Sequence, residues 1–352
     1  PKIILIAFRK KLFDEIDERK IHRGIVPRLG GIAFLPSIIF SFCVVIGFNL
    51  RTEELSLGEP LMIEMIPIFF LLCGLMLMYL VGIADDLIGV RYRGKFLLQI
   101  FTGTLLVAGG MWISDLYGFL WIHHCPDWLG WLFSIFLVIY VANAINLIDG
   151  IDGLASGLSM IALIFYSIVF FLAGEYLFAL MAATTLGTLI PFFYYNVFGH
   201  AENHNKIFMG DTGSLTIGTV LAFLSIAMFR IPLGDIPGNQ NPFILAIAPI
   251  ILPCFDVVRV FVHRVRNGSN PFLPDKCHIH HKLLALGLVQ WKALITILIS
   301  DATIVGGNLL LSSLVQPTWL ILGDITAWTL LNFLLTHLIR CRERRLGIKL
   351  YN

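Results

Sequence analysis

Five aspartates and one asparagine form three short motifs whose residue types and spacing could do chemistry on phosphates. The motifs are Asp85-Asp86, Asn146-x-x-Asp149-x-x-Asp152 and the lone Asp211. Mg²⁺ prefers oxygen ligands and usually binds through one or two carboxylates together with substrate phosphates. The motifs therefore indicate a site where carboxylate and amide oxygens bind a metal ion, accept a proton or act on a phosphate.

Asp85 and Asp86 directly follow an apolar segment, so we expect them at the C-terminal end of a membrane helix. The helix dipole is negative at that end, which disfavours two adjacent anions. Capping does not explain the pair, because acidic caps belong at helix N-termini. The plain alternative is a pair of solvated loop carboxylates. A bound cation or a catalytic role explains them better, and Lys95 could supply positive charge to a phosphate.

The second motif allows a structural as well as a functional explanation. If the chain stays helical, Asn146, Asp149 and Asp152 share one helix face. Gly150 and Gly153 indicate instead that the helix breaks here and lets backbone approach a ligand. Asp152 alone could simply cap the helix that follows, but that leaves the other two polar residues of the motif unexplained.

The third motif, Gly210-Asp211-Thr212-Gly213-Ser214, opens an apolar segment. Asp211 or Ser214 could be an ordinary N-cap. A glycine-flanked turn before a helix N-terminus is also an anion site, because free N–H groups and the positive end of the dipole meet there. A carboxylate at this position could hold Mg²⁺ while backbone amides contact a phosphate.

The polar segment 263–292 contains the run His278-Ile279-His280-His281. Its spacing matches no zinc motif that we can defend, and no pair of cysteines supports one. A cationic or hydrogen-bonding cradle for a diphosphate is favoured, and a solvated loop remains the alternative.

The composition indicates that these motifs lie in a membrane protein. The 352 residues are 57% hydrophobic and 14% charged, whereas soluble domains are about 45–50% apolar and about 25% charged. A spanning helix needs about 20 apolar residues. We predict an all-α, polytopic bundle in one domain, residues 1–352, with ten spans: 32–49, 66–84, 96–113, 130–148, 154–172, 177–195, 214–230, 243–262, 293–314 and 318–339. The apolar residues 3–8 suggest the end of an eleventh span.

The distribution of positive charge predicts the orientation. With the segment before residue 32 in the cytoplasm, all but four of the 25 Lys and Arg residues lie on cytoplasmic loops, the four being Lys2, Arg51, Arg230 and Arg259. Positive residues favour the cytoplasmic side, so the acidic motifs are predicted to face the cytoplasm. We find no nucleic-acid motif.

Three acids lie inside predicted spans. Asp256, near the inner end of span 243–262, is a weaker functional candidate. Asp301 and Asp324 lie near the outer half of their spans. We expect structural hydrogen bonding from both of them.

Four motifs in a fixed order give the chain a resemblance to the polyprenyl-phosphate N-acetylhexosamine-1-phosphate transferase family. They are the Asp-Asp pair, Asn-x-x-Asp-Gly-x-Asp-Gly, Phe-Met-Gly-Asp-Thr-Gly-Ser and His-Ile-His-His, preceded by Arg28-Leu29-Gly30-Gly31. The residues before the histidines, Pro-Phe-x-Pro-Asp, resemble the branch that uses UDP-GlcNAc and undecaprenyl phosphate. The sister branch that transfers phospho-MurNAc-pentapeptide usually has a different triple-histidine pattern.

The resemblance implies a role for each matching residue. It makes Asp85 and Asp86 the essential catalytic pair, Asn146 and Asp211 the metal ligands, and Asp149 and Asp152 the acidic motif on the nucleotide side. It also implies substrate contacts from Lys95 to phosphate, from Asn196 near the uridine or sugar, and from His278, His280 and His281 over the diphosphate.

The implied reaction transfers GlcNAc-1-phosphate from UDP-GlcNAc to a polyprenyl (undecaprenyl) phosphate and releases UMP, as the first membrane step of cell-envelope glycan synthesis. Mg²⁺ is the implied cofactor, with Mn²⁺ as an alternative, and the implied location is the bacterial inner membrane. A homodimer and a phospho-aspartate route both stay open. Rival interpretations are another UDP-HexNAc donor, a solute transporter with acids near the bilayer midplane, and an intramembrane aspartyl protease.

Overall fold

The structure, a computed structural model, describes residues 29–51, 59–200, 202–203, 205–231, 238, 240–266, 268 and 277–351. Its helices are η1 (Gly30–Ala33), α2 (Phe34–Arg51), α3 (Glu59–Ile88), α4 (Tyr92–Ala108), η2 (Phe119–Trp121), α5 (Asp127–Ile148), α6 (Leu154–Leu172), α7 (Tyr176–Phe198), α8 (Gly210–Met228), α9 (Pro242–Ile247), η3 (Ala248–Ile250), α10 (Ile251–Arg266), α11 (Ile279–Ala285), α12 (Gln290–Leu311) and α13 (Pro317–Leu346). The described ranges hold no β-sheet, only an isolated bridge between Asp115 and His124. The all-α prediction is confirmed.

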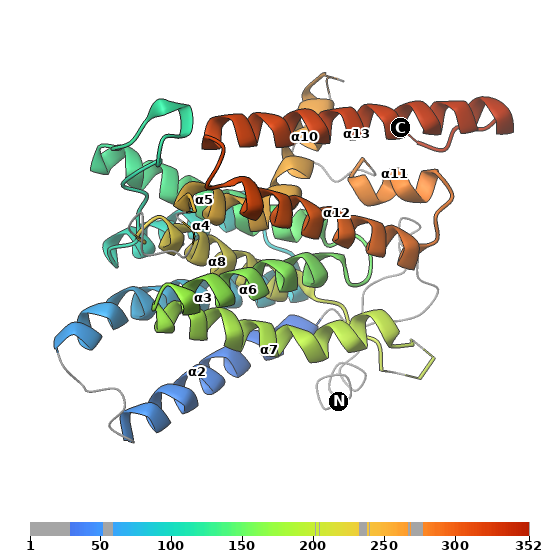
Figure 1. The fold of residues 1–352 in the computed structure, drawn as a ribbon. Helices are drawn as coiled ribbons and strands as arrows, with labels where there is room; N and C mark the ends of the chain where they lie inside the picture. The colour runs from blue at the N-terminus through green and yellow to red at the C-terminus, as the bar shows by residue number, and fades with distance from the viewer. Residues whose placement is uncertain are drawn as a thin grey trace.

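Nine helical segments in the described ranges are long and apolar enough to cross a membrane, and Figure 1 shows the long helices lying side by side in one bundle. Of the ten predicted spans, 96–113 is the one that is not among these nine. It corresponds to helix α4, which begins and ends earlier than predicted and has 17 residues. It stops at Ala108 because Gly109 and Gly110 follow, and Gly110 has a φ of +84°. The span predicted at 243–262 is a broken helix, in which η3 with Pro249 joins α9 to α10. The postulated eleventh span lies outside the described residues.

Helix α8 forms the centre of the bundle. Nearly all of its residues are buried, and it packs against α3, α5, α6 and α7. Small residues allow this close packing. A Cβ on Gly82 of α3 would come closer than 3.0 Å to the Thr212 backbone, and one on Gly31 would come equally close to the backbone of Gly213. The C-terminal end of α3 and the N-terminal end of α8 are therefore in direct backbone contact.

The two acids predicted to form structural hydrogen bonds behave differently. Asp324 accepts a hydrogen bond of 2.8 Å from Asn308 Nδ2, as expected. Asp301 does not, so that prediction is wrong: the side chain is fully buried, and neither carboxyl oxygen has a hydrogen-bond partner. Helix α12 buries this carboxyl where no donor in the described part of the chain reaches it.

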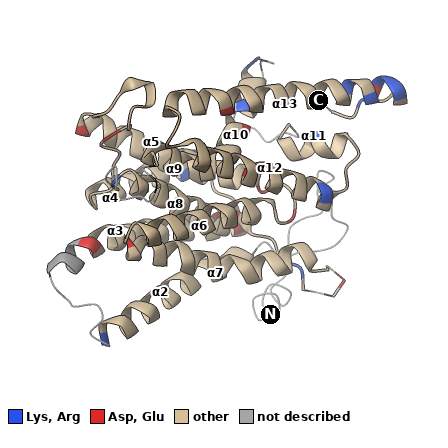
Figure 2. Cartoon of the chain, viewed as in Figure 1, with Lys and Arg blue, Asp and Glu red and all other residues tan. Residues whose placement is uncertain are grey.

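Charged residues in the bundle gather mainly at helix ends, as Figure 2 shows for the basic C-terminal end of α13. The acidic motifs follow the same pattern: Asp85 lies at the end of α3, Asp149 at the end of α5, and Asp211 in the first turn of α8. The fold thus brings the ends of several helices together around a polar site.

Candidate active site

The centre of the site is an ammonium group between two carboxylates. Lys95 Nζ, in the first turns of α4, lies 2.6 Å from Asp85 Oδ2 and 2.5 Å from Asp211 Oδ2. Each of the three side chains is no more than 25% exposed. Residues far apart in the sequence, one from each of α3, α4 and α8, therefore form one half-buried charged cluster.

Asp86, the neighbour of Asp85 in the sequence, caps another helix. Its carboxylate accepts hydrogen bonds from Asp211 N at 2.8 Å, from Thr212 N at 2.9 Å and from Thr212 Oγ1 at 2.6 Å. These donors form the first turn of α8, where N–H groups have no partner within the helix. The expectation that capping does not explain Asp86 is wrong, because the capped helix is not its own.

The second motif breaks the helix, as the glycines indicated. Helix α5 ends at Ile148, Asp149 leaves the helical conformation, and Gly153 has a φ of +80°. The three polar residues of the motif therefore do not share a helix face. Asp149 is exposed at the helix end.

The N-cap alternatives for Asp152, Asp211 and Ser214 are wrong. The N-cap positions are Gly153 for α6 and Met209 for α8, and neither makes a side-chain cap hydrogen bond. Within α8 the Ser214 hydroxyl instead donates to the Gly210 carbonyl at 3.0 Å.

Asn146 lies beside the central cluster. Its Nδ2 donates to Ser214 Oγ at 2.8 Å, and Ser214 stands three residues after Asp211 in α8. The two residues predicted as metal ligands therefore lie next to each other, one from the last turn of α5 and one from the first turn of α8.

Asp152 and Asn196 tie the broken motif to the segment before α8. Asp152 Oδ2 pairs with Lys206 Nζ at 2.6 Å. The buried Asn196 accepts from Gly153 N at 2.6 Å and donates to the Ile207 carbonyl at 2.8 Å. Both polar groups of the Asn196 amide thus bind backbone, which gives this residue a positioning function inside the site.

The histidine run is buried at the start of a short helix, so the solvated-loop alternative is wrong for it. His278 and His280 are at most 5% exposed. A Cβ on Gly150 would come closer than 3.0 Å to the His280 ring, which means that the ring lies directly against the second acidic motif. The ring of His281 packs on that of His280 with centroids 4.1 Å apart. Residues 269–276, which precede Cys277 and the histidine run, lie outside the described residues.

Burial controls the charge of His280. Desolvation, with a smaller contribution from the charge of His281, lowers the pKa of His280 to about 3. Its two ring nitrogens are buried and have no hydrogen-bond partner in the described structure. His280 is therefore a neutral imidazole, which can donate from one ring nitrogen and accept at the other.

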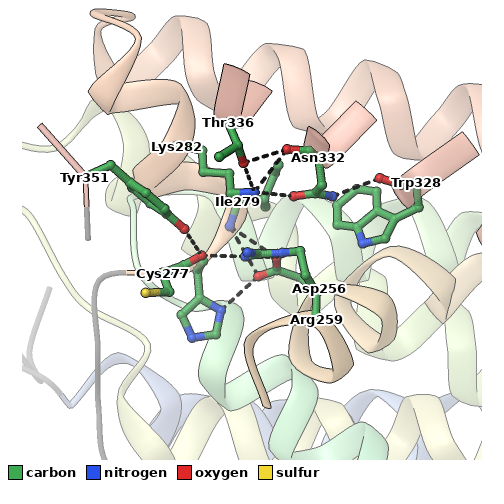
Figure 3. A network of polar contacts seen from close by, with 10 residues as sticks. Asp256, Arg259, Cys277, Ile279, Lys282, Trp328, Asn332, Thr336 and Tyr351 are labelled. Carbon is green, nitrogen blue, oxygen red and sulfur yellow. Dashed lines mark hydrogen bonds and ion pairs between the residues drawn. The ribbon is translucent and has the colours of Figure 1, made fainter. Parts of the chain in front are cut away.

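Asp256 holds the histidine run in place from α10. Its buried carboxylate lies 2.8 Å from His278 Nδ1 and 2.8 Å from Arg259 Nη2, and it accepts from Ile279 N at 3.1 Å. Figure 3 shows this network, in which Arg259 also reaches the Cys277 carbonyl. The carboxylate is acceptor-only, so the His278 proton lies on Nδ1.

Two members of the site were not predicted from the sequence. Lys206 carried a signal, because it stands five residues before Asp211 in a segment otherwise poor in charge. Arg259 follows Asp256 by three residues, the spacing of neighbours on a helix surface. Within the described ranges, no group of three or more His, Cys, Asp and Glu side chains is arranged to hold a metal ion.

Comparison with known proteins identifies the family. The family model for glycosyl transferase family 4 matches residues 68–229, the stretch that carries the three acidic motifs. A Bacillus subtilis protein, a probable undecaprenyl-phosphate N-acetylglucosaminyl 1-phosphate transferase, is 30% identical over 302 residues, which cover 84% of this chain and 76% of that protein.

Two further relatives bear the name undecaprenyl-phosphate alpha-N-acetylglucosaminyl 1-phosphate transferase. The Yersinia pestis protein is 28% identical over 84% of this chain and 76% of its own length. The Escherichia coli protein is 28% identical over 90% of this chain and 81% of its own length. The chain therefore belongs to glycosyl transferase family 4, and it is a multi-pass membrane enzyme of the glycosyl-1-phosphate transferase class.

Proposed function

We propose that this enzyme transfers N-acetylglucosamine 1-phosphate from UDP-GlcNAc to undecaprenyl phosphate and releases UMP. The observation that carries the proposal is the ammonium group of Lys95 between the carboxylates of Asp85 and Asp211. Phosphoryl transfer depends mostly on positioning and charge neutralisation, and this cluster offers both signs of charge in one half-buried site. The names of the relatives supply the donor and the acceptor.

The described residues fit a divalent cation such as Mg²⁺, with Mn²⁺ as the alternative. Asp85, Asp211 and Asn146 offer hard oxygen atoms close together, and the ammonium group of Lys95 stands in for the charge of a cation between the two carboxylates. Two carboxylates suffice, because Mg²⁺ takes further ligands from water and substrate phosphates. When bound, the ion supplies positive charge that offsets the charge building up on the UMP leaving group.

The residues of the chain divide the remaining work. An oxygen of the lipid phosphate attacks the β-phosphorus of UDP-GlcNAc, and the bond between that phosphorus and the UMP oxygen breaks. Asp85 is placed to orient the lipid phosphate and accept its proton. Asp86 is less suited to that step, because three hydrogen bonds from α8 use most of the acceptor sites of its carboxylate. It positions Asp211 instead.

The nucleotide side of the site is assigned to the broken motif and the histidine run. Asp149 is exposed at the end of α5, and Asp152 is held by Lys206. Neutral His280 packs against Gly150 with its ring nitrogens buried and unpaired, so it supports the backbone of the broken motif on the donor side.

We further propose that the site faces the cytoplasm of a bacterial inner membrane. The excess of Lys and Arg on the loops at this end supports that orientation. A site at helix ends can reach a water-soluble nucleotide sugar and a lipid phosphate at headgroup depth. The same position argues against a transporter, whose acids would lie near the bilayer midplane.

The test is an assay of the purified protein in detergent with Mg²⁺ and undecaprenyl phosphate. UDP-GlcNAc, UDP-GalNAc and UDP-MurNAc-pentapeptide are supplied in separate reactions, and UMP release and the mass of the lipid product are measured. We expect UMP release and a lipid diphosphate sugar with UDP-GlcNAc. Turnover of the pentapeptide donor alone would reassign the substrate, and absence of UMP with every donor would refute the proposal.

A further inference from the structure

The carbonyl oxygen of Cys277, one residue before the histidine run, is held from two separate elements. Arg259 Nη2 of α10 donates to it at 2.5 Å, and the Tyr351 hydroxyl donates to it at 2.7 Å. A carbonyl oxygen has two lone pairs, so both are used. Tyr351 comes from the segment after α13, and Figure 3 shows its ring reaching across to this carbonyl.

A second contact joins α11 to the C-terminal region at Lys282, two residues after His280. The Lys282 side chain of α11 is 5% exposed. Its ammonium group donates to the Asn332 carbonyl at 3.3 Å, to Asn332 Oδ1 at 3.0 Å and to Thr336 Oγ1 at 3.1 Å. All three acceptors are on α13 and none is charged.

Burial of Lys282 disfavours the charged form of its ammonium group. Desolvation, followed by repulsion from Arg259, lowers the pKa of Lys282 to about 8. A lysine that only needed solvation would extend into water. This one instead lies along α13, with the Tyr351 ring 5.9 Å from its nitrogen.

The contacts at Cys277 and Lys282 flank His280, the residue that packs against the second acidic motif. His280 lies between Cys277 and Lys282 in the sequence, and its ring is packed against Gly150. The Asp256 carboxylate fixes His278 and Ile279 from α10. A shift of the α11 segment would therefore move His280 relative to Gly150.

We propose that α13 and Tyr351 form a clamp that positions the histidine run for the nucleotide-sugar donor, acting through Cys277 and Lys282. This inference rests on the proposed function for its kinetic consequence. Tyr351 and Lys282 are positioning residues: their contacts are made to the protein, and His280 is the group that packs against the donor-side motif at Gly150. The clamp serves donor binding and leaves the acceptor side, at Asp85 and Lys95, unchanged.

The test compares Tyr351→Phe and Lys282→Met with the wild type. Tyr176→Phe is the matched control. Tyr176 is exposed at the N-terminal end of α7, whereas Asn196 of the site lies near the C-terminal end of that helix. Since one hydrogen bond contributes about 0.5–1.5 kcal/mol net, we expect the KM for UDP-GlcNAc to rise about 2- to 10-fold in Tyr351→Phe. The KM for undecaprenyl phosphate should stay at its wild-type value, and the Tm should fall by no more than the loss of one hydrogen bond explains. The control should resemble the wild type throughout.

A double-mutant cycle separates positioning from general stability. In a His280→Ala background, Tyr351→Phe should raise the donor KM no further, because residues that act through one another are not additive. Additive effects, equal rises in both KM values, or a fall in Tm without a change in donor KM would overturn the clamp.

Hydrogen exchange keeps the test independent of the proposed function. If the wild type turns over none of the nucleotide sugars, the proposed function fails, and the clamp is judged from exchange alone. The amides of residues 279–285 should then exchange faster in Tyr351→Phe than in the wild type or in Tyr176→Phe. Equal exchange rates in the three proteins would refute the clamp, whether or not the enzyme is active.

Discussion

Replacing Lys95 with methionine removes the ammonium group between Asp85 and Asp211 and keeps the length of the side chain. The two carboxylate oxygens that contact Lys95 Nζ lie 2.6 Å and 2.5 Å from it. These oxygens lie at most about 5 Å apart, so two charged carboxylates here repel by about 3 kcal/mol or more at an effective dielectric constant of about 20. Solvent reaches all three side chains in part, so about 2–3 kcal/mol is expected.

That repulsion has two measurable consequences. A divalent cation relieves it, so the affinity for Mn²⁺ should rise about 30- to 150-fold, since about 1.4 kcal/mol corresponds to tenfold. Turnover should nevertheless fall by about 10²–10³, the effect of removing one group that stabilises developing charge. Mn²⁺ binding is followed by electron paramagnetic resonance and turnover by UMP release.

Lys292→Met is the control, because Lys292 lies in the first turn of α12 away from the cluster and its ammonium group lies over the Trp291 ring. This variant should bind Mn²⁺ and turn over substrate like the wild type. If Lys95→Met had wild-type turnover, or unchanged Mn²⁺ affinity, the assignment of Lys95 as the charge partner of both carboxylates would be refuted.

Three further predictions follow from the same structure. Asp86→Ala removes three hydrogen bonds from the first turn of α8; thermal unfolding in detergent should show a loss of about 2–4 kcal/mol, and a wild-type Tm would contradict the capping role. Gly150→Ala places a methyl group closer than 3.0 Å to the His280 ring, so kcat/KM for the donor should fall at least about tenfold. Gly187→Ala is the control, because there is open space around its Cβ, and its kcat/KM should equal that of the wild type. The pKa of His280 is about 3, below its ordinary value of 6.5, so below pH 6.5 the unfolded chain binds a proton that the folded chain does not. Stability should therefore decrease as the pH falls from about 6.5 towards about 3, by at most about 1.4 kcal/mol per pH unit, and His280→Gln should show a shallower decrease; parallel curves would contradict a neutral, buried His280.

The sequence predicted the helical membrane bundle and the location of the acidic motifs at helix ends because these depend on local signals. Apolar segments of membrane length define the helices, and the acids at their ends stand out because charge is rare in such a chain. The glycines of the second motif correctly indicated a helix break. The length of α4 was not predicted, because Gly109 and Gly110 end the helix inside an apolar stretch.

The contacts between helices could not be predicted in this way. The catalytic role of Asp86 beside Asp85 stays a prediction, but no sequence pattern indicates that Asp86 caps α8, because only the close packing at Gly82 brings that helix within reach. His280 and Gly150 are 130 positions apart in the numbering, and no pattern in either motif indicates that they touch. Asp301 lacks a partner in the described structure for the same reason, since donors on neighbouring helices are set by packing.

The most direct test of the account is UMP release by Asp211→Asn. This change keeps the size of the side chain and removes the charge that Lys95 contacts. With UDP-GlcNAc, undecaprenyl phosphate and Mg²⁺, the wild type should release UMP, and the variant should insert into membranes normally and release none above background. Near-normal UMP release by Asp211→Asn would contradict the assignment of the Lys95 cluster as the catalytic centre.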